Sequence, residues 1–235
     1  MVGVYVDDII TTGDTENVKL FRERLHSELG MDDGSEFNWY LDIDTNRHPV
    51  GTYEIHQPQY IDDKCVEIRK FIGQGGSSTP LPLDYQHIRA VDTIRAKIYS
   101  GMVGSLMYAM ICTRADLPMA LSVVCRFMKQ PKEEDCDLVQ HLFHYVSRNR
   151  YLLTSKRSAP QFLAGFAGVS YNNQDEGKST LGYLLTVGDS LISWNSIRQP
   201  VMVLSKCEAE LISANSATQE ANWLKLLHQD IGYEE

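Results

Sequence analysis

The sequence predicts an α+β fold, with strands toward both ends of the chain and helices between them. Short apolar runs at either end are typical of strands, and apolar residues recur every three or four positions in the middle, as on one face of a helix. The chain has 235 residues, of which 43% are hydrophobic, so it can bury a sizeable core. These features exclude a short peptide and a disordered chain.

The first predicted elements are a hairpin and a helix. Residues 3–12 carry an apolar run on either side of Asp7 and Asp8, which predicts a tight β-hairpin. Asp14 and Thr15 can then cap a helix whose apolar residues fall at spacings of three and four, and Gly30 is a stop signal for it.

Apolar and polar side chains alternate over residues 36–44, which predicts one half-buried strand, paired with residues 52–56 across a turn. Trp39 is in phase with the apolar residues of this strand, so we expect it in the core. Tyr40 lies out of phase, and it is the better candidate for stacking on a nucleobase.

A linker and three helices are predicted next. Glycine, serine and proline crowd residues 73–82, a composition that suits the interior of neither a helix nor a strand. Three helical patterns follow, over residues 94–110, 117–128 and 139–146, and together they predict a small helical subdomain.

The last part of the chain returns to strands and closes with a helix. Four short apolar runs, separated by turn residues, predict a meander of strands at residues 162–171, 181–187, 191–194 and 201–204. Ser205 and Glu208 form an S-x-x-E capping box, which opens a helix running to Gly232. We expect Trp194 and Trp223 to pack between a strand and this helix.

Basic residues are concentrated in the middle of the chain. The formal net charge is −9 overall, but residues 71–157 carry +4, whereas residues 1–70 carry −8 and residues 158–235 carry −5. Within the middle section four cations form a candidate phosphate-contact strip for nucleic acid: Arg148, Arg150, Lys156 and Arg157. A solvated helix end, whose cations favour the C-terminal dipole, explains the same strip at least as well.

Neither a membrane span nor a zinc site is predicted. The longest nearly uninterrupted apolar run, residues 101–112, is shorter than the roughly 18 residues needed to cross a bilayer. The five cysteines include no CxxC pair, which indicates reduced thiols in an intracellular compartment, the cytoplasm or the nucleus.

Asp7 and Asp8 are the main candidates for chemistry. Two carboxylates about 4 Å apart repel each other by roughly 4 kcal/mol at an effective dielectric near 20, so something must relieve the repulsion. Either the side chains point apart into water, or they hold Mg²⁺ for phosphoryl transfer. The spacing alone leaves both interpretations open.

The segment Tyr5-Val6-Asp7-Asp8 resembles the YxDD motif of reverse transcriptases, and its YVDD form resembles the copia-type retrotransposon enzymes in particular. The resemblance continues along nearly the whole chain, through segments similar to further motifs of that family: residues 31–44, 57–61, 99–108, 113–116, 177–182, 192–199 and 205–224.

The resemblance implies a Pol polyprotein of a transposable element, a nucleotidyltransferase that copies RNA into DNA and whose RNase H domain cuts the RNA of the hybrid. It implies a C-terminal palm fragment with the YVDD hairpin and a primer-grip-like strand (residues 1–70), a linker (71–92), a helical thumb and connection (93–157) and a truncated RNase H-like domain (158–235). The implied partners are an RNA template, an RNA–DNA hybrid and remaining Pol segments, and the implied cofactor is Mg²⁺.

By the same resemblance, Asp7, Asp8 and Glu210 are the catalytic residues and Mg²⁺ ligands that this chain carries. The third palm aspartate belongs upstream of residue 1, and Gly168 and Ser170 stand where the family's RNase H strand has two aspartates. Because each carboxylate both neutralises and positions the cations, we expect a reverse-transcriptase fragment that is inactive alone.

Two alternatives remain open. In the first, the chain is a non-catalytic module that binds nucleic acid or a protein partner through its basic middle section. In the second, it complements separately encoded polymerase segments, although the exposed edge of the hairpin argues against this because the chain supplies no strand to cover it.

Overall fold

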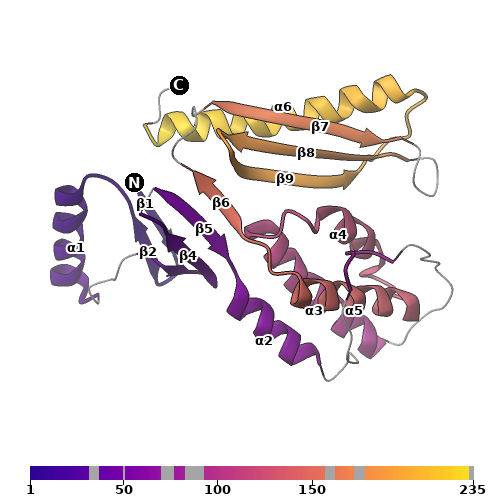
Figure 1. Cartoon of the computed structure of the whole chain (residues 1–235), viewed down its shortest axis with the longest axis horizontal. Coiled ribbons are helices and arrows are strands. Elements are labelled where there is room, and N and C mark those ends of the chain that lie inside the picture. The colour runs from indigo at the N-terminus through magenta and orange to yellow at the C-terminus, as the bar shows by residue number, and fades with distance from the viewer. Residues whose placement is uncertain are drawn as a thin grey trace.

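The computed structural model describes residues 1–31, 37–49, 51–69, 77–82, 93–156, 162–171 and 178–232. It confirms the mixed α+β class, with helices packed against antiparallel sheets (Figure 1). In chain order the elements are β1 (Val2–Tyr5), β2 (Asp8–Thr11), α1 (Thr15–Leu29), β3 (Trp39–Tyr40), β4 (Ile43–Arg47), β5 (Thr52–His56), α2 (Pro58–Ile68), α3 (Thr93–Cys112), α4 (Pro118–Val124), the 3₁₀ helix η1 (Cys125–Phe127), α5 (Glu133–Arg148), β6 (Leu153–Lys156), β7 (Leu163–Ser170), β8 (Thr180–Val187), β9 (Ser190–Arg198) and α6 (Lys206–Asp230).

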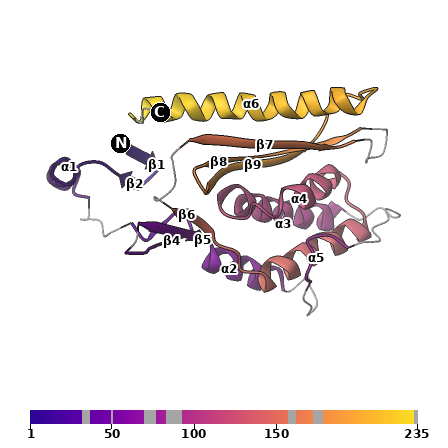
Figure 2. The ribbon, with the colours of Figure 1, turned by 45° about the horizontal axis from the view of Figure 1, so that its top comes forward.

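Most of the molecule is arranged in layers, as Figure 2 shows. α6 lies along one face of the β7–β8–β9 sheet, and α3 and α4 lie on the other face. α2 and α5 complete the helical layer. The β3–β4–β5–β6 sheet lies beside this layer, and the β1–β2 hairpin and α1 lie at that end of the molecule (Figure 1).

The hairpin at the start of the chain is confirmed. β1 and β2 pair antiparallel with Tyr5 opposite Asp8, so Val6 and Asp7 form the turn and Asp8 already belongs to the second strand. The turn therefore lies one residue earlier than the two acids suggested.

The helix α1 also begins and ends as predicted. The Asp14 carboxylate accepts a hydrogen bond from the backbone N–H of Asn17 at 3.4 Å, which caps the first turn. Gly30 adopts a left-handed φ of 65° and its N–H donates to the carbonyl of His26, which ends the helix.

The prediction of one continuous strand over residues 36–44 is wrong. The chain turns at Leu41 and Asp42, which adopt φ values of 50° and 58°, so β3 folds back on β4 as a hairpin. The hydroxyl of Tyr108 on α3 donates a hydrogen bond to the Leu41 carbonyl and holds the turn against the helical layer. The prediction for Trp39 is wrong as well, because its side chain is 54% exposed rather than part of the core.

The strand β6 has no counterpart in the sequence-based prediction. It pairs antiparallel with β5, from Thr52 opposite Lys156 to Ile55 opposite Leu153, and completes the strand order β3-β4-β5-β6. Its four residues show no apolar run, and their partners lie about a hundred residues away in the sequence, so a local pattern gives no signal for this strand.

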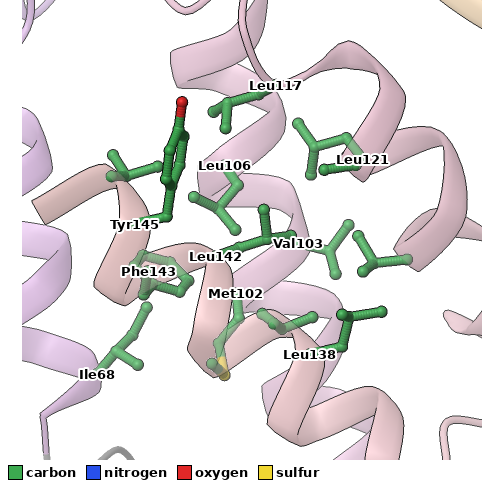
Figure 3. Packing of buried hydrophobic residues seen from close by; sticks show 14 of the residues in the cluster. Ile68, Met102, Val103, Leu106, Leu117, Leu121, Leu138, Leu142, Phe143 and Tyr145 are labelled. Carbon is green, nitrogen blue, oxygen red and sulfur yellow. The ribbon is translucent and has the colours of Figure 1, made fainter. Parts of the chain in front are cut away.

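The main hydrophobic core lies in the helical layer (Figure 3), and the three predicted helical patterns are confirmed there as α3, α4 with η1, and α5. α2 adds a fourth helix whose buried side chains join this core. Figure 3 shows side chains from these helices converging on one another: Ile68, Met102, Val103, Leu106, Leu117, Leu121, Leu138, Leu142, Phe143 and Tyr145. Their burial removes a large apolar area from water, which is the main stabilising contribution to this layer.

The described part of the predicted linker, residues 77–82, lies against α5. The Ser77 hydroxyl and the Thr79 carbonyl are 2.8 and 2.7 Å from Nε2 of His141, and Leu81 packs against the helical core. Residues 77–82 are therefore tied to the helical layer. The rest of the predicted linker lies outside the described residues.

An ion pair is buried just after the end of α3. The Arg114 side chain is 1% exposed, and its Nε and Nη2 donate to the Asp116 carboxylate at 2.8 and 2.7 Å. The guanidinium carbon lies 5.6 and 5.5 Å from the ring centres of Tyr145 and Tyr151. Burial of Asp116 opposes its ionisation, but the hydrogen bonds and charge of Arg114 outweigh this, so the pKa of Asp116 lies below its ordinary value.

The C-terminal sheet has the strand order β7-β8-β9, and three of the four predicted strands are confirmed in it. The fourth prediction, a strand at residues 201–204, is wrong, because this run is a loop into α6 with Val203 buried and Leu204 exposed. Ser205 caps α6 as predicted, since its hydroxyl accepts from the N–H of Glu208 at 3.2 Å.

Both predictions for the tryptophans near α6 are wrong. The indole N–H of Trp194 donates to the Met110 carbonyl on α3 at 3.0 Å, so Trp194 packs toward the helical layer rather than toward α6. Trp223 is 56% exposed. Aromatic residues on a strand or helix have two available faces, and the sequence does not show which face carries the neighbouring layer.

The variant Asp42→Gly should unfold at a higher denaturant concentration than the wild type. Glycine adopts a positive φ without the steric penalty that an L side chain meets, although asparagine and aspartate tolerate this region better than other residues. We expect a gain of about 0.5 kcal/mol in the free energy of unfolding, measured by urea titration. The control Asp42→Ala removes the same charge without the conformational freedom, and it should be less stable than the wild type. Equal stability of the two variants would contradict the role assigned to the turn.

The variant Asp116→Asn should lose about 2 kcal/mol of stability at pH 7, because the buried guanidinium of Arg114 then lacks its charged partner. Since the pKa of Asp116 is depressed in the folded protein, the stability it contributes is fully present above its unfolded pKa of about 3.9 and is lost as the pH falls through the lower folded value. Urea titrations at several pH values should therefore show that the difference in free energy of unfolding between the wild type and Asp116→Asn decreases below about pH 4. A difference that stays constant down to pH 3 would refute this.

Candidate functional site

The tip of the β1–β2 hairpin carries the acid pair that the sequence singled out. Asp7 lies in the turn and Asp8 opens β2, and both side chains are exposed. Val6 in the same turn adopts a φ of 49°, which is rare for a β-branched residue and costs roughly 1–2 kcal/mol. Backbone strain of this kind clusters at functional sites.

A groove of about 800 Å³ lies beside the acid pair. Its walls are the β1–β2 hairpin, α1, and the β3–β4 hairpin with the residues before it. The charged and aromatic residues on these walls are Asp7, Asp8, Lys19, Arg22, His26, Phe37, Trp39, Tyr40 and Arg47. The groove therefore joins the acid pair to the segment that contains Tyr40.

The groove combines cations with aromatic rings. Lys19, Arg22 and Arg47 bring positive charge, which attracts phosphate groups. Phe37 and Tyr40 lie with their ring centres 6.3 Å apart, next to the exposed Trp39, and exposed rings are platforms on which bases stack. The chemistry of the walls therefore suits a chain that carries both phosphates and flat rings.

The acid pair suits part of a magnesium site. Mg²⁺ is usually bound through one or two carboxylates together with waters and substrate phosphates, so Asp7 and Asp8 can supply suitable oxygens. Among the described residues, however, no three His, Cys, Asp or Glu side chains lie close enough together to hold a metal ion. The carboxylates seen here do not complete a metal centre by themselves.

The third predicted acid, Glu210, lies in a different part of the molecule. It is on α6, which begins at the end of the molecule away from the hairpin (Figure 1). Ser213, one turn after Glu210, donates a hydrogen bond to the carbonyl of Gly168 on β7 at 2.8 Å, so this part of α6 packs on β7. A Cβ atom on Gly168 would have no described atom within 4 Å, so there is room for a side chain at this position.

The predicted basic strip is spread over several elements. Arg148 ends α5 and is exposed, and Lys156 ends β6 and is exposed. Arg150 is held by α2, because its guanidinium forms an ion pair with Asp62 and donates to the Pro58 carbonyl at 3.2 Å. Arg157 lies outside the described residues. The strip as a phosphate-contact surface stays a prediction, but Arg150 has a structural role as well.

The cations of the groove are not among the residues predicted from the sequence. Lys19 and Arg22 lie three positions apart on α1, a spacing that places them on one face of the helix, and this was the available signal. Arg47 joins them through the fold of the β3–β4 hairpin, which no local pattern indicated.

Within the described residues no helix is long and apolar enough to cross a membrane.

Comparison with known proteins identifies relatives among transposon polyproteins. The chain is 37% identical over 135 residues to the retrovirus-related Pol polyprotein from transposon TNT 1-94 of Nicotiana tabacum, which covers 57% of this chain and 10% of that protein. It is 27% identical over 236 residues to the Pol polyprotein from transposon RE1 of Arabidopsis thaliana, which covers 97% of this chain and 16% of that protein.

A third relative is similar over nearly its whole length. It is the uncharacterized mitochondrial protein AtMg00810 of Arabidopsis thaliana, 28% identical over 232 residues, which covers 94% of this chain and 92% of that protein. The chain thus spans about a tenth to a sixth of the length of the two polyproteins and most of the length of AtMg00810. No protein-family model and no solved structure matches it.

A double-mutant cycle on Arg150 and Asp62 should detect their ion pair in the folded protein. The pair is partly exposed, so we expect a coupling energy of about 0.2–1 kcal/mol between Arg150→Gln and Asp62→Asn in urea titrations at low salt. The coupling should shrink in high salt because screening weakens exposed pairs. Additive effects of the two substitutions at low salt would show that Arg150 has no structural role through Asp62.

Proposed function

Because the chain belongs to the copia-type family of retrovirus-related Pol polyproteins of transposons, we propose that it contributes the acid pair of an RNA-directed DNA polymerase. In this proposal, residues 1–70 are the C-terminal part of a palm, residues 93–157 a thumb and connection, and residues 158–235 a truncated RNase H-like domain. Its partners in this proposal are an RNA template, an RNA–DNA hybrid and further Pol segments. The chain would then act in the cytoplasm or the nucleus.

The observation that carries the proposal is the position of Asp7 and Asp8 at the tip of a hairpin, directly on the wall of a groove with cations and aromatic rings. A polymerase needs acids beside the end of a nucleic-acid strand. The β3–β4 hairpin, with the exposed Trp39 and the half-buried Tyr40, lies on the same groove and is the primer-grip-like element of this proposal.

Magnesium, when bound, would neutralise the phosphates that react. The oxygens for it in this chain are those of Asp7 and Asp8, and a complete centre needs at least one more ligand than the described residues bring there. We therefore propose that the chain alone does not polymerise DNA. Its own residues form the hairpin and the groove and bind the nucleic-acid strand that lies beside them.

The C-terminal part supports a second site only weakly. The antiparallel strands β7, β8 and β9 followed by α6 agree with the beginning of an RNase H-like domain, and Glu210 is its candidate acid. Gly168 and Ser170 bring no carboxylate from β7. We propose that this site does not cut the RNA strand of a hybrid.

A second candidate function is a module that binds nucleic acid without catalysis. The groove favours it, because its cations and aromatic rings do not depend on a metal ion. The two candidates make different predictions for the acid pair. Catalysis needs both carboxylates, whereas binding alone should improve when a negative charge beside the phosphates is removed.

The polymerase proposal can be tested in a chimera with the RE1 polyprotein, in which this chain replaces the matching segment. We expect the chimera to incorporate deoxynucleotides on a primed RNA template with Mg²⁺, and we expect Asp7→Asn and Asp8→Asn each to lower incorporation at least 100-fold. The unaltered RE1 polyprotein is the positive control. A chimera that folds and binds the template but incorporates nothing would count against the proposal.

The same assay on the chain alone tests its inactivity. Incorporation should equal that of the Asp7→Asn variant of the chain. Incorporation that this substitution abolishes would show that the described carboxylates suffice, and would overturn that part of the proposal.

A further inference from the structure

We infer that a second copy of this chain pairs with the free edge of β7, so that two chains form a symmetric dimer with Phe166 on its two-fold axis. The strand order of the C-terminal sheet is β7-β8-β9, and among the described residues no strand pairs with the other edge of β7. The strand at the opposite side of the sheet, β9, lies against α4 and β6. The inference uses neither Asp7 nor Asp8 and therefore goes beyond the proposed function.

The free edge of β7 lacks the features that keep strand edges apart. Native proteins protect such edges with charged residues, proline or β-bulges. Residues 163–170 contain no charged residue and no proline, and the register irregularity of this sheet lies between β8 and β9. A long, uncharged strand of this kind is a template for a further strand.

The pairing of β7 with β8 shows which backbone groups face the free edge. The N–H of Gly188 donates to the Phe162 carbonyl at 3.1 Å, in the pair immediately before Leu163. Because hydrogen-bonded pairs alternate in an antiparallel ladder, the even-numbered residues of β7 bond to β8. The N–H and C=O groups that point to the free edge therefore belong to the odd-numbered residues: Leu163, Gly165, Ala167 and Val169.

These groups complement a second copy of themselves. In the inferred dimer the two β7 strands run antiparallel, with Phe166 opposite Phe166. Leu163 of one chain then faces Val169 of the other, and Gly165 likewise faces Ala167. Each of these pairs exchanges two bonds, so the two edges would form about eight hydrogen bonds. The interface is closed, because both chains use the same edge.

Phe166 provides the apolar contact at the axis. Its side chain is 64% exposed. It points away from α6, because side chains alternate along a strand and Leu163, three positions earlier, packs in the cluster beneath α6. Residues opposite each other in a pair without mutual hydrogen bonds are the closest in a ladder, and aromatic pairs there are stabilising. Dimerisation would therefore cover a ring that a single chain leaves exposed.

The helix α6 leaves room for the second copy. It lies over β7 and β8 and runs antiparallel to β7 (Figure 1), so two copies of it would lie side by side about 10 Å apart, as packed helices do. Glu220 accepts a hydrogen bond from Ser193 on β9 at 2.8 Å, so that flank of α6 faces β9. The opposite flank, toward the free edge, carries Ala214 and Ala221, whose small side chains permit the approach.

Charge complementarity favours the same arrangement. Ser213 on α6 bonds to the Gly168 carbonyl, and Phe166 lies two residues, about 7 Å, along β7 from there. That distance corresponds to about four residues of a helix, so the axis passes about four residues after Ser213. Glu210 and Lys225 lie on the edge-facing flank, at similar distances on either side of that point. Each Glu210 would therefore lie beside Lys225 of the second copy.

Sedimentation velocity of the full chain between about 1 and 100 μM tests the dimer. The wild type should sediment with twice its monomer mass of 26.7 kDa. Phe166→Lys places two like charges opposite each other on the axis, so it should raise the dissociation constant at least about tenfold. The matched control Ile197→Lys adds the same charge at an exposed apolar residue of β9 and should leave the constant unchanged. Urea titrations show whether both variants keep the fold.

A disulfide tests the position of the axis. In a Cys207→Ser background, which removes an exposed native thiol, Phe166→Cys would bring two thiols within bonding distance on the axis. The matched control Ala164→Cys lies on the same face of β7, but its two copies would be about 13 Å apart, too far for a disulfide. After mild oxidation, a non-reducing gel should show a covalent dimer for Phe166→Cys and not for Ala164→Cys.

The inference would be overturned by a wild type that stays monomeric at about 100 μM, or by a dimer that Phe166→Lys weakens no more than Ile197→Lys does. A covalent dimer that Ala164→Cys forms as readily as Phe166→Cys would overturn it as well. A monomeric wild type would leave the edge of β7 to a strand of another protein. None of these results bears on the polymerase proposal, which the chimera assay tests through Asp7 and Asp8.

Discussion

The structure depends on a buried guanidinium that the fold must keep paired. Arg114 is enclosed by the Asp116 carboxylate and two tyrosine rings, directly after the end of α3. Taking this charge out of water is costly unless its partners stay in place, so the pair fixes how α3, α4 and α5 meet. The hydroxyl of Tyr108 and the carbonyl of Met110, both on α3, then hold the β3–β4 turn and β9 respectively. One helix thus positions both larger sheets.

The sequence predicts the elements whose signal is local. Apolar spacing and caps suffice for α1, α3, α5 and α6, because a long helix repeats its pattern over several turns and marks its ends with Asp14, Gly30 or Ser205. The turn at Leu41 and Asp42 is not predicted, because leucine is rare at a positive φ and the apolar alternation continues through the turn. β6 escapes because pairing with a distant strand, rather than its own composition, makes it a strand.

The candidate site is likewise only partly predictable from the sequence. Asp7 and Asp8 belong to the four-residue motif that begins at Tyr5, so the sequence suffices to find them. The cations and aromatic rings that line the same groove lie on separate elements, α1, β3 and β4 among them, and only the fold brings these together. Arg150 has a further role that a count of charges does not reveal, since its guanidinium pairs with Asp62 of α2. Composition reports which charges exist, and packing decides which of them face a ligand.

The pairing of β5 with β6 has a consequence for the synthesis of the chain. The ribosome synthesises residues 52–55 about a hundred residues before residues 153–156. One edge of β5 therefore stays unpaired while the helical layer is synthesised and folds. Closing so long a segment carries an entropic cost that a preformed helical core reduces, because α2 and α5 already bring the ends together. A nascent chain released before residue 156 would therefore expose an unpaired strand edge that can pair with other chains, and chaperones bind chains of this kind.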